Sequence, residues 1–445
     1  VGRFWVAPLA GSFWVDETVT AFVVAHGGGH WSLAVAPQVP QSIYYALPAA
    51  VRALGGGSEA AYRLPSVVAM GLALLFCARM AARLIHPEAG WVVVTASFLL
   101  RGFSDAATDA RPYALGLCVA SLSLWGLIRW LDDGHWRDAA LFVGAAALLW
   151  PTHLIYWPFY LVYPLYAGVR LWRRESAVGW VRMLGSFAVL GVLLLPVAWR
   201  ALALAREAGA HVIVPTPDLR ALKYALKFGL ALSAVPGAWI LHRVWKTPVR
   251  PWSVSAGVLA LGWWFVHPLC LFGYSVLTGN SVFLPRYLSL AWPGILLGTA
   301  YLAARWMPDR AWRPVALFAG VWALVHPAGR PWTGPAHGSD WRGAAAAVAA
   351  LHDPAIPVVC PSPFVEATAP EWRPDYPLPG FLYAHLDRYP VAGRPLLLPF
   401  ERTEAGLHYA GQLAQTVLPG AGRFVIYGGD RNVWFWRRWF SLRPE

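Results

Sequence analysis

The sequence predicts a mainly α-helical polytopic membrane protein of about ten spans, followed by a small C-terminal α/β domain. The 445-residue chain is 58% hydrophobic and only 13% charged, whereas soluble domains carry roughly 25% charged residues. Long apolar runs recur, and arginines gather in the short segments between them, as in cytoplasmic loops of membrane proteins. Pro, Gly and charge then rise, which divides the chain into 1–336, the membrane domain, and 337–445.

Ten apolar segments have the composition of membrane spans, which need about 20 residues each. Trp, Tyr and Arg at many of their edges fit the anchors found at membrane interfaces. The expected spans are 64–84, 89–103, 112–131, 137–151, 153–170, 178–200, 222–243, 253–278, 286–304 and 312–328.

The loops between these spans alternate in charge, which predicts their sides of the membrane. Arginine-rich loops, such as the one between Arg170 and Arg182, should face the cytoplasm. The segments that alternate with these loops should face outward; they are 14–62, 102–111, 151–153, 201–221, 279–285 and the residues after 329. The outer side therefore receives Asp16, Asp105, Asp109, His153 and Arg286. This places both the candidate site and the C-terminal domain outside the cytoplasm.

Two outer regions are not spans. Short amphipathic stretches at 17–26 and 42–54 predict helices lying in the membrane interface. In 337–445, helical patterns at 340–352 and 404–416 each precede a strand-like run, at 356–360 and 423–427. This alternation predicts an α/β domain.

Because only 15 residues precede Asp16, too few for a span, we expect a further helix upstream of Val1.

Composition also limits the class of function. Only three of the 36 basic residues are lysines, and arginines gather in short loops between apolar runs as the positive-inside rule expects, so the net charge of +13 does not by itself indicate nucleic-acid binding. The four cysteines are scattered without a CxxC pair, which argues against a disulfide framework or a thiolate metal site.

Asp16 and Glu17 are the most informative residues, because charge near lipid is rare unless it faces a wet cavity and has a function. Asp16 is our candidate general base, a role that suits a carboxylate beside an acceptor hydroxyl. The alternative is that Asp16 caps a helix beginning near Glu17. Glu17 would orient the neighbours of Asp16 or bind a metal.

A second acidic pair, Asp105 and Asp109, is spaced to share one helix face and would position an acceptor or a metal. A solvated loop is the alternative. Arg111 is a candidate phosphate ligand, since arginine forks suit phosphate, or a structural partner of these aspartates. For Arg63, phosphate binding and anchoring at the interface are both open.

Further candidates lie where spans begin or end. Arg286 and Tyr287 open a span from the outside, where a charge requires a partner such as phosphate. His153 follows the end of the fourth span and would touch substrate. The pair His26 and His30 is better explained as polar loop residues than as metal ligands, because three glycines separate them.

Several short motifs occur in the order found in one known family. They are Trp14-Val15-Asp16-Glu17, Ile43-Tyr44-Tyr45, Arg63-Leu64-Pro65-Ser66, Ala110-Arg111-Pro112-Tyr113, Pro285-Arg286-Tyr287 and Asp340-Trp341-Arg342-Gly343. With them the chain resembles the bacterial glycosyltransferase family 39-like membrane proteins of the GT-C fold. These are relatives of the protein O-mannosyltransferases and of the lipid A aminoarabinose transferases. The basic residue that many relatives carry before the paired tyrosines is absent from Gln38–Ser42.

The resemblance implies an inverting transfer of a sugar from a polyprenyl-monophosphate donor to a lipid, glycan or protein acceptor at the outer face of the bacterial inner membrane. It assigns the first-loop acidic position to Asp16 and the second-loop acidic position to Asp105 or Asp109. A divalent metal is compatible with this chemistry but is not required by it. The implied substrate-binding residues are Arg63, Arg111, Tyr113, Arg286, Tyr287, Tyr44, Tyr45 and His153.

Two other classes of function remain as alternatives. A lipid-linked sugar transporter or flippase would favour charges near the bilayer midplane and inverted repeats, whereas here the charges lie at span ends. A non-catalytic membrane scaffold descended from such enzymes is the second alternative.

Overall fold

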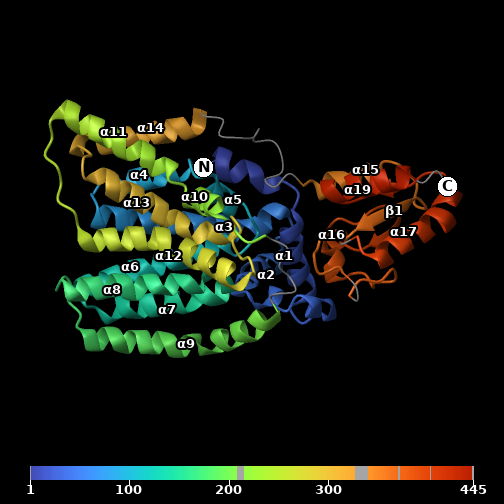
Figure 1. Ribbon diagram of the computed structural model, residues 1–445, viewed down its shortest axis with the longest axis horizontal. Coiled ribbons are helices and arrows are strands. Elements are labelled where there is room, and N and C mark those ends of the chain that lie inside the picture. Colours follow the sequence, from blue (N-terminus) through green and yellow to red (C-terminus); the bar gives the residue numbers. More distant parts are fainter. Residues whose placement is uncertain (1, 208–214, 326–338, 369–370, 401, 443–445) are drawn as a thin grey trace. The chain divides into compact units, whose positions relative to one another are not determined.

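The computed structural model describes residues 2–207, 215–325, 339–368, 371–400 and 402–442. Its contacts divide the chain into two compact units (Figure 1). The first unit contains Val1–Val6, Ser42–Tyr44 and Arg63–Trp332, and the second contains Ala7–Gln41, Tyr45–Tyr62 and Thr333–Glu445. The expected boundary at 336/337 lies outside the described residues. The grouping differs from a simple N-terminal and C-terminal division, because most of the outer loop packs with the C-terminal part.

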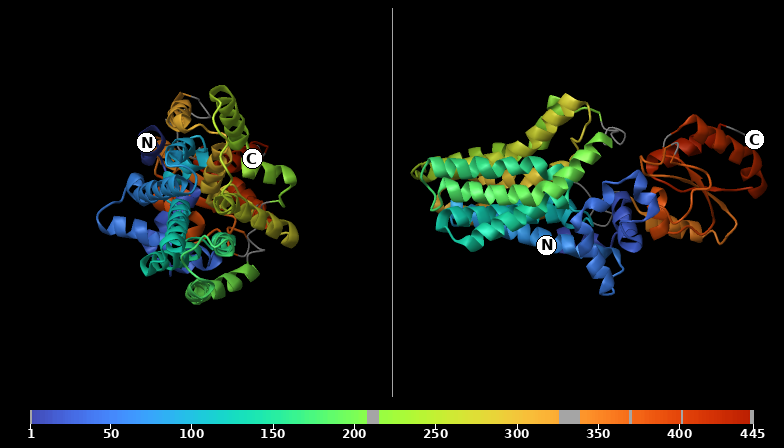
Figure 2. Two further views of the ribbon diagram at one scale, coloured as in Figure 1. Left: turned by 90° about the vertical axis from the view of Figure 1, so that its left-hand side faces the viewer. Right: turned by 90° about the horizontal axis from the view of Figure 1, so that it is seen from below.

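The first unit is a bundle of helices that run side by side (Figures 1 and 2). Short 3-10 segments, η6 (Leu154–Leu161) and η8 (Tyr287–Ala291), lead into two of its helices. The helices are α3 (Glu59–Leu84, whose first turn is in the second unit), α4 (Ala89–Ser97), α5 (Arg101–Ala107), α6 (Tyr113–Asp133), α7 (Trp136–Thr152), α8 (Val162–Trp172), α9 (Trp180–Glu207), α10 (Leu219–Leu226), α11 (Gly229–Trp245), α12 (Val254–Thr278), α13 (Trp292–Ala304) and α14 (Trp312–Val325).

Five helical segments of the described chain are long and apolar enough to cross a membrane: α3, α6, α9, α12 and the combined η8–α13. The pair α10 and α11 adds a sixth, bent by 51°. The bend falls at Lys227, whose φ of 46° is left-handed and cannot continue a right-handed helix.

Three expected spans are interrupted instead of continuous. The helix expected over 89–103 ends at Ser97, where the N–H groups of residues 98–100 bond three residues back instead of four, and α5 then starts at Arg101. The 153–170 span begins as the 3-10 segment η6, which contains Pro158. The 222–243 span is broken between α10 and α11. Apolar composition shows that a segment enters lipid but does not fix where its helix breaks.

Close helix contacts rest on small residues. Gly294 of α13 faces the backbone of Trp264 in α12 so closely that a Cβ at this position would collide with it. Gly126 of α6 stands similarly close to the backbone of Phe142 in α7. Such small-residue contacts are typical of membrane helices, which associate largely through close van der Waals packing.

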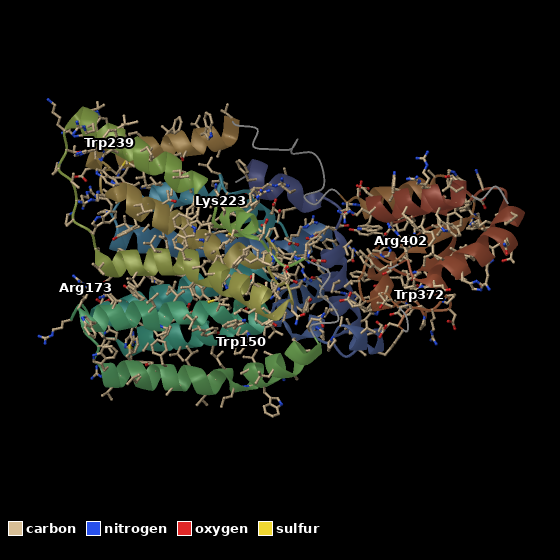
Figure 3. All side chains as sticks on the ribbon, viewed as in Figure 1. Trp150, Arg173, Lys223, Trp239, Trp372 and Arg402 are labelled. Carbon is tan, nitrogen blue, oxygen red and sulfur yellow. The ribbon has the colours of Figure 1, made fainter. Side chains whose placement is uncertain are left out.

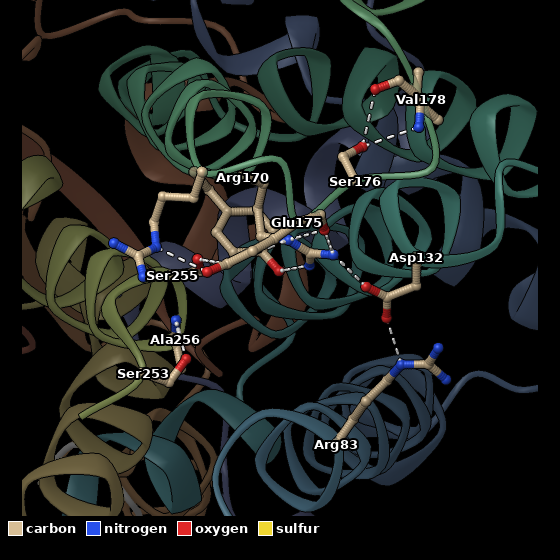
Figure 4. A network of polar contacts seen from close by, with 11 residues as sticks. Arg83, Asp132, Arg170, Glu175, Ser176, Val178, Ser253, Ser255 and Ala256 are labelled. Atoms are coloured by element: carbon tan, nitrogen blue, oxygen red, sulfur yellow. Dashed lines mark hydrogen bonds and ion pairs between the residues drawn. The ribbon is translucent and has the colours of Figure 1, made fainter. Parts of the chain in front are cut away.

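A partly buried ion-pair network joins helix ends at one end of the bundle (Figure 4). The guanidinium of Arg170 bonds the Asp132 carboxylate at 2.5 Å and the Tyr166 hydroxyl at 2.8 Å. It also donates to the backbone oxygen of Glu175. Arg83 reaches the other oxygen of Asp132 at 2.6 Å. The network connects α3, α6 and α8 directly through Asp132.

The second unit combines outer-loop helices with a three-stranded sheet. The sheet is parallel in the order β2-β1-β3, with Val359 opposite Leu396 and Val358 opposite Val425. The strands are β1 (Pro357–Pro361), β2 (Arg394–Leu398) and β3 (Val425–Ile426). The helices are α1 (Val15–His26), α2 (Ala46–Ala53), α15 (Trp341–Ala349), α16 (Ala384–Arg388), α17 (Glu404–Thr416), α18 (Leu418–Ala421) and α19 (Asp430–Ser441).

The expected α/β character of the C-terminal part is confirmed. The helices expected at 340–352 and 404–416 correspond to α15 and α17, and the expected strands correspond to β1 and β3. The strand β2 is absent from the sequence prediction, because its Arg394-Pro395 start lacks the apolar signal. The two helices expected in the outer loop are present as α1 and α2.

Candidate functional site

Three cationic or imidazole side chains of the first unit gather where helices begin or end. Arg111 precedes Pro112, which starts α6. His153 lies between α7 and η6, and Arg286 immediately precedes η8. Arg111 and Arg286 are both close enough to His153 to act electrostatically on its ring. We call Arg111, His153 and Arg286 the cationic cluster.

Aromatic rings surround His153. The ring of Tyr113 stacks at 5.7 Å, and those of Tyr156 and Tyr287 lie at 5.3 Å, all measured between ring centroids. The guanidinium of Arg286 stands 5.4 Å from the Tyr287 ring, within cation–π range. The aromatic wall therefore limits water around the cationic cluster and strengthens its electrostatic field.

The tautomer of His153 follows from its backbone contact. Its Nδ1 accepts the N–H of Ile155 at 3.3 Å, which leaves the proton of the neutral ring on Nε2. The loop that holds it is fixed by Trp150, labelled in Figure 3, whose indole N–H donates to the Leu154 oxygen at 2.9 Å. His153 is thus a half-buried hydrogen-bond donor beside two arginines.

A second layer supports this cluster from α12. His267, fully buried, bonds the backbone oxygen of Tyr287 at 2.9 Å through Nε2. Trp263 donates its indole N–H to the Leu290 oxygen at 2.7 Å. Both bonds fix η8, and therefore the position of Arg286 at its start.

The outer-loop segment 42–44 also joins the first unit. The Ser42 hydroxyl donates to the Thr152 oxygen at 2.6 Å, beside His153 in sequence. The hydroxyl groups of Tyr44 and Ser66 lie 3.1 Å apart. Arg63, three residues before Ser66, is 2% exposed, which favours a buried role over a simple interface anchor.

The acidic pair of the first unit does not share a helix face. Asp105 is in α5 and pairs with Arg101 at 3.4 Å, whereas Asp109 is buried beyond the end of the helix at Ala107. The expectation of one face is therefore wrong. At the end of the helix, the Thr108 hydroxyl bonds the Ser104 oxygen, and Pro112 then disfavours helical conformation at Arg111, so the helix does not resume before α6.

The other acidic pair lies at the start of α1 in the second unit. The Glu17 carboxylate is fully buried and accepts the Trp14 N–H at 3.2 Å, as the third residue of a capping box does. Asp16 is the second residue of the helix and is half-buried. The helix begins at Val15, so the alternative in which Asp16 caps it is wrong, and the capping role falls to Glu17.

The remaining candidates are divided between the units. Tyr45 is buried at the start of α2 in the second unit, whereas Tyr44 is in the first. His26 ends α1 and pairs with Asp387 at 2.9 Å, so it is not a loop residue.

Among the described residues, no group of three or more His, Cys, Asp or Glu side chains is arranged to hold a metal ion.

Two residues of this site, Tyr156 and His267, are absent from the sequence prediction. A histidine in the middle of an apolar span was the available signal for His267. Nothing local distinguishes Tyr156 from its aromatic neighbours.

Comparisons with known proteins agree with this fold. No protein-family model matches the chain, and no curated protein matches it. The crystal structure of ArnT from Cupriavidus metallidurans in the apo state superposes with a TM-score of 0.53 at 15% identity, over 95% of this chain and 87% of that chain. ArnT of the same organism bound to undecaprenyl phosphate gives a TM-score of 0.49 at 15% identity, over 98% and 89%. The apo likeness confirms the GT-C membrane fold that the motifs implied.

Proposed function

We propose that this protein is an integral-membrane glycosyltransferase that takes its sugar from a polyprenyl-monophosphate donor. Two independent features support the proposal. The fold is that of ArnT, and the first unit gathers Arg111, Arg286 and His153 inside an aromatic wall. An enzyme working outside the cytoplasm has no nucleotide-sugar pool, so a lipid-phosphate sugar is the available donor.

The cationic cluster is the observation that carries the proposal. A departing lipid phosphate carries negative charge, and guanidinium groups bind phosphate through paired N–H donors. His153 Nε2–H adds a neutral donor. Because these groups are fixed by η6, η8 and their supports on α12, they require little reorganisation as charge develops, which is the basis of electrostatic catalysis.

In the proposed reaction the acceptor hydroxyl attacks the anomeric carbon of the sugar. The new carbon–oxygen bond forms as the bond from that carbon to the phosphate oxygen breaks. The acceptor proton passes to a carboxylate, and the lipid phosphate leaves with the bonding electron pair. One displacement inverts the anomeric centre. We assign the carboxylate to Asp16, with Asp109 or Asp105 as the alternatives and Glu17 as its helix cap.

The first test is transfer of radiolabelled sugar from polyprenyl-phosphate donors by membranes that carry wild-type protein or Asp16→Asn. We expect transfer by the wild type and a loss of about 100-fold or more in the variant, the usual contribution of a general base. Asp105→Asn and Asp109→Asn are the matched variants. Unchanged transfer in Asp16→Asn would move the base assignment to whichever of these two loses activity.

The phosphate assignment has its own test. Arg286→Gln and Arg111→Gln should each reduce transfer by about 100-fold, because each removes stabilisation of the leaving phosphate. Arg137→Gln, at an exposed helix start away from the cluster, is the control and should transfer normally. Equal activities of all three variants would contradict a phosphate role for the cationic cluster.

We also propose that the candidate site faces the outside of the inner membrane. A cysteine introduced at exposed Thr278, before the arginine-poor 279–285 segment, should react with a membrane-impermeant thiol reagent in intact cells. A cysteine at exposed His135, between Arg129 and Arg137, should react only after permeabilisation. The reverse pattern would contradict this orientation. A transporter would instead move labelled donor across vesicles without forming a glycosylated product.

A further inference from the structure

The helix that carries Asp16 is held at both ends by one short segment of the C-terminal part. Within the second unit, α1 packs against α16 (Figure 1). Residues 387 and 389, at the end of α16, reach the two ends of α1 separately. The candidate base is therefore carried by an element whose position depends on residues more than 360 positions away in the chain.

The hydroxyl of Tyr389 fixes the start of α1. It accepts the backbone N–H of Phe13 at 2.8 Å and donates to the Glu59 carboxylate at 2.8 Å. Phe13 is completely buried and Glu59 is 8% exposed, so neither bond is readily replaced by water. Burial raises the pKa of Tyr389, which keeps the hydroxyl protonated and able to donate.

The surroundings of Phe13 strengthen this anchor. The guanidinium of Arg388 lies 5.2 Å from the Phe13 ring, and the Tyr62 ring meets it edge-on at 5.7 Å. Arg388 also donates to the Gly57 oxygen at 2.9 Å. The chain just before Asp16 thus has both its backbone and its side chain fixed.

The carboxylate of Asp387 fixes the opposite end of α1. It accepts a hydrogen bond from Nε2 of His26, the last residue of the helix, at 2.9 Å. Beyond this end, the hydroxyl of Ser32 accepts the N–H of Phe381 at 2.9 Å. Because Gly27 has a φ of 81° and ends the helix, the pair with Asp387 holds the final residue where the chain turns away.

We infer that Tyr389 and Asp387 are positioning residues for Asp16, acting through the two ends of α1. This inference rests on the proposed function, because it takes Asp16 as the base. It assigns the C-terminal part a direct role in catalysis: it supplies the fixed support against which the acidic helix is oriented. A displacement of about 1 Å in a reacting group is sufficient to reduce a rate about 100-fold.

The test uses the full chain in detergent or nanodiscs and two readouts. Hydrogen exchange of peptides covering residues 13–26 reports whether α1 is held, and it needs no substrate. Sugar transfer from a polyprenyl-phosphate donor gives kcat and KM. The variants are Tyr389→Phe, Asp387→Ala and Asp387→Asn, which keeps an oxygen that can accept from His26.

The matched control is Tyr383→Phe. Tyr383 is fully buried in the same unit, and its hydroxyl donates to the Leu398 oxygen at 2.7 Å, so its loss tests the general effect of removing a buried hydroxyl. We expect Tyr389→Phe to speed exchange in α1 roughly tenfold, as loss of a buried hydrogen bond allows, and Asp387→Ala to speed it less, about threefold, because the bond to His26 is partly exposed. We expect kcat to fall at least about tenfold while the donor KM changes less than about threefold. Asp387→Asn should recover much of the loss.

The outcomes separate the inference from the function. Unchanged exchange in α1, or faster exchange with kcat unchanged, overturns the inference. Equal losses in Tyr383→Phe also overturn it, since the effect would then be general destabilisation. Wild-type protein that transfers no sugar overturns the proposed function, whereas the exchange data still decide whether Tyr389 and Asp387 hold α1.

Discussion

At the scale of single residues, neighbouring polar groups of this protein have sharply different roles. Asp16 and Glu17 are adjacent, yet Glu17 is buried and caps α1 through Trp14, whereas Asp16 is half-buried and has no capping role. Adjacent helix positions point in different directions. The buried position of Glu17 and the half-buried position of Asp16 therefore predict different roles for the two carboxylates.

This difference predicts opposite phenotypes for the two carboxylates. Glu17→Ala should lower the free energy of unfolding by about 1–2 kcal/mol, because it removes a buried cap. Asp16→Asn should change stability by less than about 0.5 kcal/mol while abolishing transfer. Thermal unfolding in detergent measures both. A larger loss of stability in Asp16→Asn than in Glu17→Ala would contradict the capping assignment.

The two arginines that bond the Asp132 carboxylate allow a second prediction at the scale of single residues. The Arg170 side chain is 9% exposed and that of Arg83 is 39% exposed. Arg170→Met should cost about 3 kcal/mol of stability, since it leaves buried acceptors without their donor. Arg83→Met should cost at most about 1 kcal/mol, as exposed pairs do. The two thermal midpoints measured side by side test this, and equal shifts would exclude it.

At the scale of elements, the contact of α12 with α13 depends on a missing side chain. An added Cβ at Gly294 would collide with the backbone of Trp264, which cannot rotate away as a side chain can. Gly294→Ala should therefore destabilise the protein by about 1–3 kcal/mol through overpacking. The substitution should also displace η8, which immediately precedes α13. Arg286, the residue just before η8, should then shift as well.

A glycine in open space gives the control for this element. Gly191 of α9 has nothing within 4 Å of an added Cβ. Gly191→Ala should raise stability by about 0.5–1 kcal/mol, because alanine is the better helix former. Thermal unfolding of the two alanine variants and of the wild type measures both changes in stability. Similar losses of stability in both variants would mean that the close approach of α12 does not require glycine at position 294.

At the scale of the whole molecule, acid should destabilise the second unit through one buried histidine. His385 of the second unit is fully buried between the rings of Trp341 and Tyr427. Both its nitrogens lack hydrogen-bond partners among the described residues. Burial lowers the pKa of His385 from its usual 6.5 to about 3, so the ring stays neutral in the folded unit.

The sign of the pH effect follows from proton binding. Below pH 6.5 His385 becomes protonated in the unfolded chain, whereas in the folded unit it stays neutral down to about pH 3. Stability therefore falls as pH falls through this window, by up to about 1.4 kcal/mol per pH unit. Hydrogen exchange should show β1 and α16 losing protection as the pH falls through this window. His385→Phe should flatten this dependence, and an unchanged slope in the variant would contradict the assignment.

Much of the candidate site could be predicted from sequence, but its grouping could not. The sequence predicts Arg286 because charge at a span end needs a partner, Arg111 because guanidinium forks suit phosphate, and His153 because it follows a span end. The structure places the three together. The shared helix face of Asp105 and Asp109 was wrong, because sequence spacing assumes a continuous helix and α5 ends at Ala107. Their roles in catalysis, like that of Asp16, remain predictions.

The sequence by itself determined the membrane class, the helical segments, the α/β character of the C-terminal part and the motifs of the GT-C resemblance. The first three follow from local composition and periodicity, which act over about 20 residues, whereas the resemblance depends on the order of the short motifs. Only the tertiary structure decided that most of the outer loop packs with the C-terminal part. It alone also decided that Tyr389 and Asp387 hold α1 and that His267 supports η8. Such contacts join residues far apart in the chain, and their partners are selected by shape and by the burial of polar groups, which no local pattern records.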